Sequence, residues 1–498
     1  MPVITDNIAS LGYATPELVL AGFFLFILLA DLVFTRNRGQ MACTLAILGL
    51  AMTLLVTLRL YPAGERLLFA KMMAIDPFAL FFKIFFVGST AVIVLLSPAT
   101  AYIPRTRQGE YYAFLLAITL GMSLLASAAD LVMIVLALEM VSVTSYLLAG
   151  FMKEQAASAE AALKYAIYGA VATGTMVYGM SLLYGITGTT NLYEMPQAIA
   201  RGGAAPLALF VAVLLVLVGF GYKIAAVPFH MWAPDVYEGA PTPVTALLSV
   251  GPKAAGFAVL IRFFYAALAV PAGPGRWNPV ADIDWPLLVA VISAVTMTVG
   301  NLIAINQSNL KRLLAYSAIA HAGYILMGFV LLNGQGLYAM LFYLIVYAFM
   351  NLGAFLVVIA LAGPLRSEEL KDYAGLASRT AFPAVAMAVF LFSLTGIPPL
   401  AGFVGKFYLF AALIEAGRAW LWLAVVGVLN SVISLYYYAR IVKAMFLEKG
   451  PSGRLTVASA HQVLIAALLI PTVLLGIYWA PVARFTDYSL RLLGPLAR

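Results

Sequence analysis

Cysteine and histidine are almost absent from this sequence of 498 residues, which contains one cysteine and three histidines. The single cysteine, Cys43, excludes a framework of disulfide bonds and an iron–sulfur cluster held by this chain alone. The histidines, His230, His321 and His461, are too widely separated in the sequence to indicate a haem or metal site. If the protein takes part in redox chemistry, we therefore expect other subunits to bind the redox cofactors.

Charged residues are also scarce, at 10% of the chain, whereas 64% of the residues are hydrophobic. A soluble domain has about 25% charged and about 45 to 50% apolar residues, so this composition predicts an all-α polytopic membrane protein. The net charge of +8 does not indicate nucleic-acid binding, because the basic residues lie in short segments between apolar runs. No signal-peptide pattern precedes the first apolar run, so we expect that span to be retained.

Apolar runs of about 20 residues predict fourteen transmembrane helices. Of the 29 lysines and arginines, fourteen lie beside the connections that follow odd-numbered spans, ten lie on the other side and five lie inside spans. This bias predicts that both termini face the outer, periplasmic side of the membrane. The predicted spans are 16–34, 41–60, 76–97, 111–127, 131–151, 156–186, 206–232, 242–270, 285–305, 311–332, 336–361, 381–415, 420–446 and 462–482.

Two successive groups of five predicted spans, in residues 109–271 and 272–449, share one layout. In each group prolines interrupt the fourth span, at Pro228 and at Pro398 with Pro399. Because an odd number of spans reverses the orientation of the next group, the pattern predicts two inverted five-helix repeats, each with a broken helix, as in transporters whose broken helices mark the ion site. We expect residues 1–108 to add three helices and residues 450–498 to add one.

Ionisable side chains interrupt several of the apolar runs: Glu139, Lys164, Lys223, Lys253 and Lys406 all lie well inside predicted spans. A lysine at the centre of a span costs about 2.5 to 3.5 kcal/mol, so these groups must be paired, hydrated or neutral. Ionisable residues kept at such a cost indicate an ion or proton path.

Two prolines lie close to these lysines and remove backbone donors from predicted helices. Pro228 follows Lys223 by five residues and frees the carbonyl of Ile224, while Pro252 directly precedes Lys253 and frees a carbonyl one turn earlier. We expect such carbonyls to accept hydrogen bonds from an ammonium group or a water molecule.

Glu139 and Lys164 lie at similar depths in successive spans, which predicts an ion pair between them. A pair separated by about 4 Å, at an effective dielectric constant near 20, is worth about 4 kcal/mol, which can switch a buried lysine between protonated and neutral forms. Moving one charge against 100 mV costs about 2.3 kcal/mol, so this energy is sufficient for pumping. The alternative partner is Glu160, four residues before Lys164 on the same helix.

The other polar residues have structural alternatives. His230, seven residues after Lys223 and so about two helical turns away, is either part of the path or satisfied in the core, and so is His321. Lys311 and Arg312 are either positive anchors at the membrane surface or a site where protons enter. Lys83 is interpreted as a snorkelling or packing lysine, Asp76 and Asp130 as helix N-caps, and Trp232 and Trp420 as interfacial anchors.

Three motifs resemble those of the antiporter-like membrane subunits of respiratory complex I. They are KIAAVPFHMWAPDVYEGAPTPV at 223–244, NLKRLLAYSAIAHAGY at 309–324 and GIPPLAGFVGKFYLF at 396–410. The resemblance covers essentially all fourteen spans. It implies fourteen helices with inverted five-helix repeats, and proton translocation driven by electron transfer from NADH to quinone.

The resemblance also implies roles for individual residues. Glu139 and Lys164 match the family's ion pair in the fifth and sixth spans. Lys223 matches the lysine of the broken helix, Lys253 the lysine of the central axis, and Lys406 the twelfth-span residue of the second half-channel.

Lys311 and His321 fall within the tenth-span motif, where the family's polar axis links the two halves. The resemblance implies that NADH, FMN, iron–sulfur clusters and quinone are bound by partner subunits, with no cofactor on this chain. The implied partners are other membrane subunits of respiratory complex I, including neighbouring antiporter-like subunits, in a bacterial inner membrane. The alternatives are a subunit of a multisubunit cation/proton antiporter or membrane-bound hydrogenase, and a purely structural membrane subunit.

Overall fold

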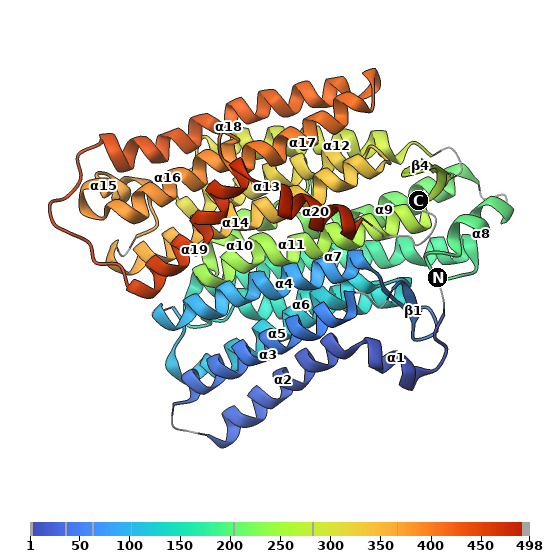
Figure 1. Ribbon diagram of the computed structural model, residues 1–498, viewed down its shortest axis with the longest axis horizontal. Helices are drawn as coiled ribbons and strands as arrows, with labels where there is room; N and C mark the ends of the chain where they lie inside the picture. Colours follow the sequence, from blue (N-terminus) through green and yellow to red (C-terminus); the bar gives the residue numbers. More distant parts are fainter. Residues whose placement is uncertain are drawn as a thin grey trace.

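The computed structural model describes residues 3–34, 37–61, 64–100, 102–202, 205–280, 283–365 and 367–490. Most of these residues form helices that lie side by side in one elongated bundle (Figure 1). Within the described ranges, twelve helices are long and apolar enough to cross a membrane. They are α2 (Thr15–Val33), α3 (Arg38–Leu60), α4 (Pro77–Leu96), α5 (Gln108–Ser127), α6 (Leu131–Ala149), α7 (Ala156–Thr187), α9 (Pro206–Ile224), α11 (Thr242–Ala267), α12 (Trp285–Ala304), α14 (Gly334–Leu365), α18 (Leu421–Leu447) and α19 (Ser459–Ile477).

Two more spans complete the predicted set. Helix α13 (Leu310–Phe329) has 20 residues and packs along α12. The twelfth predicted span is broken into α16 (Ala381–Thr395) and α17 (Ala401–Glu415), and the seventh into α9 and the short helix α10 (Trp232–Gly239). The predicted fold, an all-α membrane protein with a broken helix in each five-helix repeat, is confirmed.

The two repeats match in the details of their third and fourth spans. The third helix of each, α7 and α14, has 32 residues. The first half of each broken helix ends at a residue in the left-handed conformation, Ala225 with φ 58° after α9 and Gly396 with φ 93° after α16. Each break also contains a cis peptide bond before a proline. Both repeats therefore have non-helical backbone at the same place in their fold.

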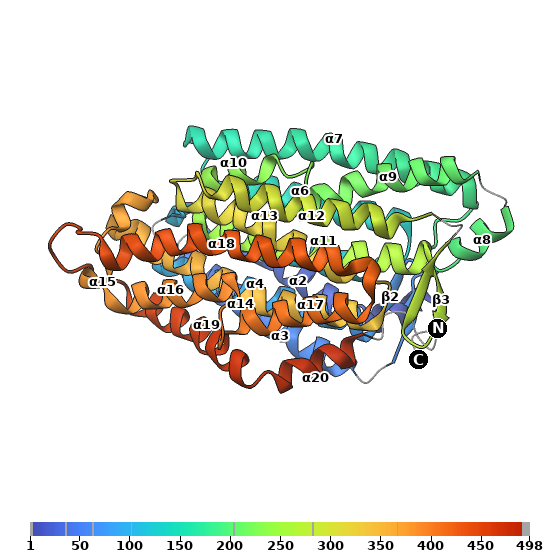
Figure 2. The same ribbon diagram turned by 90° about the horizontal axis from the view of Figure 1, so that it is seen from above.

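Shorter elements lie at the ends and on the outside of the bundle. Figure 1 shows α1, α8 and the two antiparallel hairpins at one end and α15 toward the other, while Figure 2 shows α20 on the outside. In the first hairpin Arg66 pairs with Ile75. These elements are α1 (Asn7–Tyr13), α8 (Met195–Gly202), α15 (Leu376–Arg379), α20 (Ala480–Ser489), β1 (Arg66–Leu68), β2 (Met73–Ile75), β3 (Ala269–Gly273), β4 (Arg276–Pro279) and the 3-10 turns Ser97–Ala99, Arg105–Arg107, Leu370–Tyr373 and Arg418–Trp420.

The centre of the bundle is α11, in which every residue is buried. It contacts helices of both repeats and also α4 of the N-terminal segment. A helix that is buried on all sides must be apolar on all sides unless its polar groups find partners. The position of α11 therefore places Lys253 and Arg262 in the interior.

Two aspartates begin membrane spans as predicted. The Asp76 carboxylate accepts a hydrogen bond from the Ala79 backbone N–H at 2.7 Å at the start of α4. Asp130 accepts one from the Val132 N–H at 2.9 Å at the start of α6. Each carboxylate satisfies a helix N–H group that has no partner within the helix.

The structure decides three assignments of single residues. Of the two alternatives for Lys83, helix packing is confirmed and snorkelling is wrong, because the side chain is buried and its ammonium group lies 2.6 Å from Glu17 of α2. Arg262 is one of the ten basic residues assigned from the sequence to the side of the termini, but it lies inside α11. Trp232 is no interfacial anchor, because its ring stacks on Tyr165 in the interior with ring centroids 4.3 Å apart. Arg36, Arg366, Arg491 and Arg498, which contribute to the predicted charge bias, lie outside the described residues.

Candidate functional site

Lys223 lies in the last turn of α9, immediately before the break in this helix. Its buried ammonium group donates a hydrogen bond to the Ser142 hydroxyl of α6 at 3.1 Å. Gly256 of α11 makes room for the side chain, since a Cβ there would lie 3.2 Å from the lysine Cγ. Glu139 lies one turn before Ser142 on the same helix, α6. This position makes Glu139 the candidate acidic partner of the broken-helix lysine.

The predicted contact between Glu139 and Lys164 is wrong. The ammonium group of Lys164 lies 2.7 Å from Glu160 and 2.6 Å from Asp235. The alternative partner Glu160 is thus confirmed, as the spacing of four residues on one helix face allows. Asp235, from α10 of the broken helix, was not expected as a partner.

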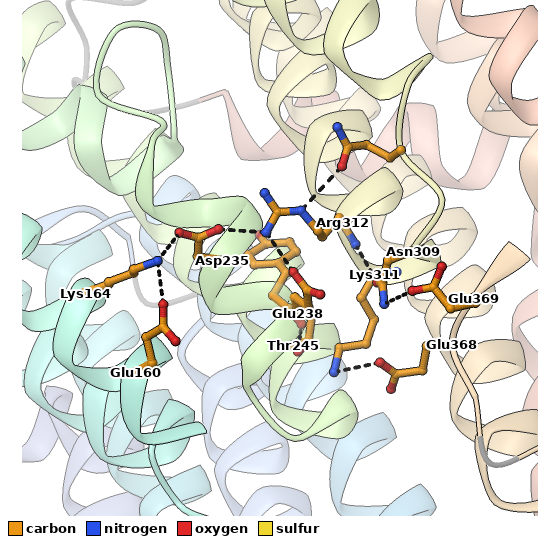
Figure 3. A network of polar contacts seen from close by, with 12 residues as sticks. Glu160, Lys164, Asp235, Glu238, Thr245, Asn309, Lys311, Arg312, Glu368 and Glu369 are labelled. Carbon is orange, nitrogen blue, oxygen red and sulfur yellow. Dashed lines mark hydrogen bonds and ion pairs between the residues drawn. The ribbon is translucent and has the colours of Figure 1, made fainter. Parts of the chain in front are cut away.

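Lys164 belongs to a polar network that joins the two repeats (Figure 3). The guanidinium group of Arg312, at the start of α13, lies 2.7 Å from Asp235 and 2.7 Å from Glu238. Asp235 therefore bridges Lys164 in the first repeat and Arg312 in the second. The carboxylates 235 and 238 lie three residues apart in the DVYEGAP segment, a spacing that places both on one helix face and that could have identified them.

Lys311 takes part in a neighbouring contact rather than in membrane-surface anchoring (Figure 3). Its buried ammonium group donates to the Ala240 carbonyl at 3.0 Å and lies 3.3 Å from the Glu368 carboxylate. Glu368 also accepts a hydrogen bond from the Thr242 hydroxyl at 2.9 Å. Sequence reasoning did not single out Glu368, because it lies in a polar connection between spans.

Lys253 projects from α11 toward α13. Its ammonium group donates to the Ala318 carbonyl at 2.6 Å. His321 lies one turn further along α13, and its two ring nitrogens lie 2.7 Å from the Tyr343 hydroxyl and 3.3 Å from the Tyr438 hydroxyl. Lys253 reaches Ala318 and Lys406 lies over the ring of Tyr324, three residues on either side of His321 on α13. The histidine therefore lies between the central lysine and the lysine of the second broken helix.

Lys406 lies in the second turn of α17, and its side chain extends back to the second break. Its ammonium group donates to the Thr395 carbonyl and to the Ser431 hydroxyl, both at 2.9 Å, and lies 4.3 Å from the centre of the Tyr324 ring. Thr395 is the last residue of α16, where the helix leaves carbonyl groups without backbone donors. Lys223 and Lys406 thus both meet a serine hydroxyl of a neighbouring helix beside a helix break.

The carbonyl groups freed by Pro228 and Pro252 do not accept hydrogen bonds from the nearby lysines, so this part of the expectation is wrong. In the first repeat, α9 ends before Pro228, so Lys223 reaches Ser142 rather than the Ile224 carbonyl. Lys253 reaches Ala318 on another helix. His230 lies in the non-helical break, so the two helical turns expected between Lys223 and His230 do not form.

The structure thus divides the predicted residues into two sets, with His230 of the first break outside both. Lys223, Lys253, His321 and Lys406 form a buried row through both repeats, and Glu139 lies one turn from Ser142, the hydrogen-bond partner of Lys223. Lys164 and Lys311 belong instead to the polar network of Figure 3. In the described part of the chain, no group of three or more His, Cys, Asp or Glu side chains could hold a metal ion.

A bundle with two inverted repeats, a broken helix in each and a buried row of lysines defines the class of antiporter-like membrane subunits. Residues 128–434 match the family model described as NADH:quinone oxidoreductase/Mrp antiporter, transmembrane. The chain belongs to this family and, within it, to the group of proteins named NADH-quinone oxidoreductase subunit N.

The similarity extends over nearly the whole chain. The NADH-quinone oxidoreductase subunit N of Anaeromyxobacter sp. (strain Fw109-5) is 48% identical, with 99% of both chains covered. A chain of respiratory complex I from Thermus thermophilus is 31% identical over 94% of this chain and 98% of that chain, with a TM-score of 0.78. A chain of the Mrp complex from Dietzia sp. DQ12-45-1b has a TM-score of 0.84 at 22% identity, covering 97% and 98% of the two chains, which shows a shared fold.

Replacing Asp235 by asparagine is expected to destabilise the polar network by about 1 kcal/mol. A hydrogen bond to a charged group is worth about 1.5 to 3 kcal/mol, but a pair in contact with solvent contributes about 0.2 to 1 kcal/mol, and the Asp235 and Lys164 side chains are 32% and 39% exposed. The thermal unfolding midpoint of the purified complex measures the effect. Glu160→Gln is the matched control, because this carboxylate pairs with one cation only, and equal shifts in the two variants would contradict the bridging role of Asp235.

Proposed function

We propose that this chain is the proton-translocating membrane subunit of an NADH-quinone oxidoreductase. The observation that carries the proposal is the buried row Lys223, Lys253, His321 and Lys406, which runs through both repeats and ends beside a helix break on each side. The 48% identity to a protein named NADH-quinone oxidoreductase subunit N supports it. Buried ionisable groups of this kind, facing the bundle interior, are the usual components of proton relays.

In this proposal protons move by changes in charge along the row. When a proton leaves Lys223, the lysine becomes neutral and Glu139 loses a positive charge nearby. When a proton reaches Lys253, its positive charge acts on His321, which lies one turn from the Ala318 carbonyl that binds Lys253. The tyrosine hydroxyls on both ring nitrogens of His321 can pass a proton toward Lys406. The serine hydroxyls at Lys223 and Lys406 and the open backbone at the breaks are the points where water would enter.

The same proposal assigns the redox chemistry to partner subunits. NADH, FMN, iron–sulfur clusters and quinone would be bound there, and this chain would contact other membrane subunits, among them neighbouring antiporter-like subunits. We place the protein in a bacterial inner membrane with its termini on the periplasmic side. We divide the chain into residues 1–108, 109–271, 272–449 and 450–498, as an N-terminal segment, two repeats and a C-terminal helix.

A multisubunit cation/proton antiporter is the second candidate, because the family model covers both kinds of complex and the Mrp chain shares the fold. The two candidates differ in their partners. An NADH-quinone oxidoreductase subunit is expected to co-purify with iron–sulfur subunits, whose absorption and electron paramagnetic resonance signals identify them. Co-purification with antiporter subunits alone would favour the second candidate.

The central test of the proposed function is Lys253→Met, which keeps the length of the side chain but removes its charge. We expect NADH-driven proton uptake into liposomes that contain the assembled complex to be lost, because the row is interrupted at its centre. The matched control is Lys443→Met, whose native side chain is 66% exposed and outside the row. Native proton uptake by the Lys253 variant, measured per NADH oxidised, would contradict the proposal.

A further inference from the structure

An apolar pocket of about 450 Å³ lies outside the candidate path, between α4, α14, α19 and α20. In Figures 1 and 2, α20 lies on the outside of the bundle, where it packs against α4 and α14. The pocket contains none of the charged residues of the row or of the polar network. Its main walls are formed by Phe81, Phe85, Gly88, Ala348, Phe349 and Phe485.

The protein's own side chains do not fill this pocket. Gly88, in the middle of α4, is exposed toward the pocket, and a Cβ added there would meet no atom within 4 Å. Among the described residues, Ser89 is the one polar residue of the lining, and a single hydroxyl does not supply the about two to four polar partners that a stable water molecule needs. An empty pocket forfeits the dispersion contacts of its walls. Because α4 and α14 are membrane-spanning helices, the surrounding solvent is hydrocarbon. The occupant that fits these conditions is a hydrocarbon chain.

The lining of the pocket extends along α4 from Phe81 to Val92 and along α14 from Ile345 to Leu352. Phe81 and Phe85 lie in the first half of α4, which begins at the end of the bundle where the two hairpins lie (Figure 1). Ala348 and Phe349 lie near the middle of the 32-residue helix α14. An acyl chain that enters the bilayer at the end of the bundle with the hairpins would run in this direction, along α4.

Helix α20 supplies charges beside the apolar walls. Phe485 faces the pocket, whereas Arg484 and Asp487 are exposed on the same helix. Neither charged side chain forms an ion pair within the described part of the chain. A cation and an anion three residues apart complement a headgroup that carries both a phosphate and an ammonium group.

We propose that this pocket binds one acyl chain of a phosphatidylethanolamine molecule, whose phosphate lies against Arg484 and whose ammonium group lies against Asp487. The bound lipid fills the space between the N-terminal segment, the second repeat and the C-terminal helix. This site is independent of the proposed proton path, because the two share no residue.

Photolabelling with a phosphatidylethanolamine that carries a diazirine within one acyl chain tests the pocket. In the reconstituted complex we expect label on residues 81–92 and 345–352 severalfold above that on Leu95, an exposed residue on the same helix. Gly88→Leu is expected to remove the excess by filling the space, while Gly22→Leu, at an exposed glycine of α2 that also has no atom within 4 Å of its Cβ, leaves it unchanged. Ala348→Leu repeats the test from the opposite wall.

The headgroup is tested by comparing this probe with the matching phosphatidylglycerol. We expect the native protein to be labelled more strongly by the ethanolamine lipid, and Asp487→Asn to abolish the preference, because phosphatidylglycerol has no ammonium group. Arg484→Gln is expected to weaken labelling by both lipids. Labelling no stronger than at Leu95, an excess that survives both filling variants, or crosslinks to another polypeptide at Gly88 would overturn the proposal.

Discussion

Replacing Arg262 by methionine is expected to destabilise the folded protein by about 3 to 5 kcal/mol, the usual result of leaving one partner of a buried ion pair uncompensated. The guanidinium group binds Asp76 through two hydrogen bonds of 2.7 and 2.9 Å, and both side chains are fully buried. It also donates to the Ala126 carbonyl at 3.0 Å and to the Tyr193 hydroxyl at 2.9 Å. One side chain of α11 therefore joins three other parts of the chain.

The amount of assembled complex on native gels and its thermal unfolding midpoint measure this effect. Arg276→Met is the matched control, because the native side chain is exposed on β4 and its loss should change neither quantity. In the double variant Asp76→Leu with Arg262→Met, we expect part of the stability to return, since no charge is then left without a partner. If Arg262→Met were as stable as the native protein, the pair would contribute nothing to holding α4 against α11.

Replacing Glu139 by alanine is expected to abolish proton pumping while the complex still assembles. Glu139 lies in the middle of α6, one turn from Ser142, which binds the Lys223 ammonium group, so its loss removes a negative charge from the surroundings of the broken-helix lysine. Glu139→Gln should have the same effect, because it keeps the shape and removes the charge. Proton uptake by liposomes, measured together with quinone reduction, reports the loss.

Glu160→Gln is the control for this prediction as well. It also removes a carboxylate from a membrane-spanning helix, but from the exposed pair with Lys164, which contributes little because solvent screens it. We expect it to retain pumping. Normal pumping by the Glu139 variants would refute the role of this residue, and loss of assembly without loss of pumping per complex would show a structural role instead.

The polar row was largely predictable from the sequence, whereas its contacts were not. Lys223, Lys253 and Lys406 are recognisable because each interrupts an apolar run, and an unpaired charge there has a high energetic cost. The Ser142 and Ser431 hydroxyls that meet two of these lysines give no such signal, since a serine in a membrane helix can satisfy itself on its own backbone.

The predicted ion pair failed for a similar reason. Equal depth in successive spans placed Glu139 and Lys164 together, but depth does not determine which way a helix is rotated about its axis. In the folded chain Lys164 points to Asp235, 71 residues further on. The same limit applies to the pairs Lys83 with Glu17 and Arg262 with Asp76. Each pair joins two helices, and no pattern of nearby residues in the sequence shows that these helices are neighbours.

The sequence by itself determined the fourteen spans, the two breaks and the presence of costly charges inside them, because burial in hydrocarbon and the missing proline donor act on short stretches of chain. Only the tertiary structure decided which carboxylate serves which cation and where an apolar space is left open. Those outcomes depend on how helices rotate and pack against partners that are distant in the chain, and the energy of each contact arises only when both sides are in place.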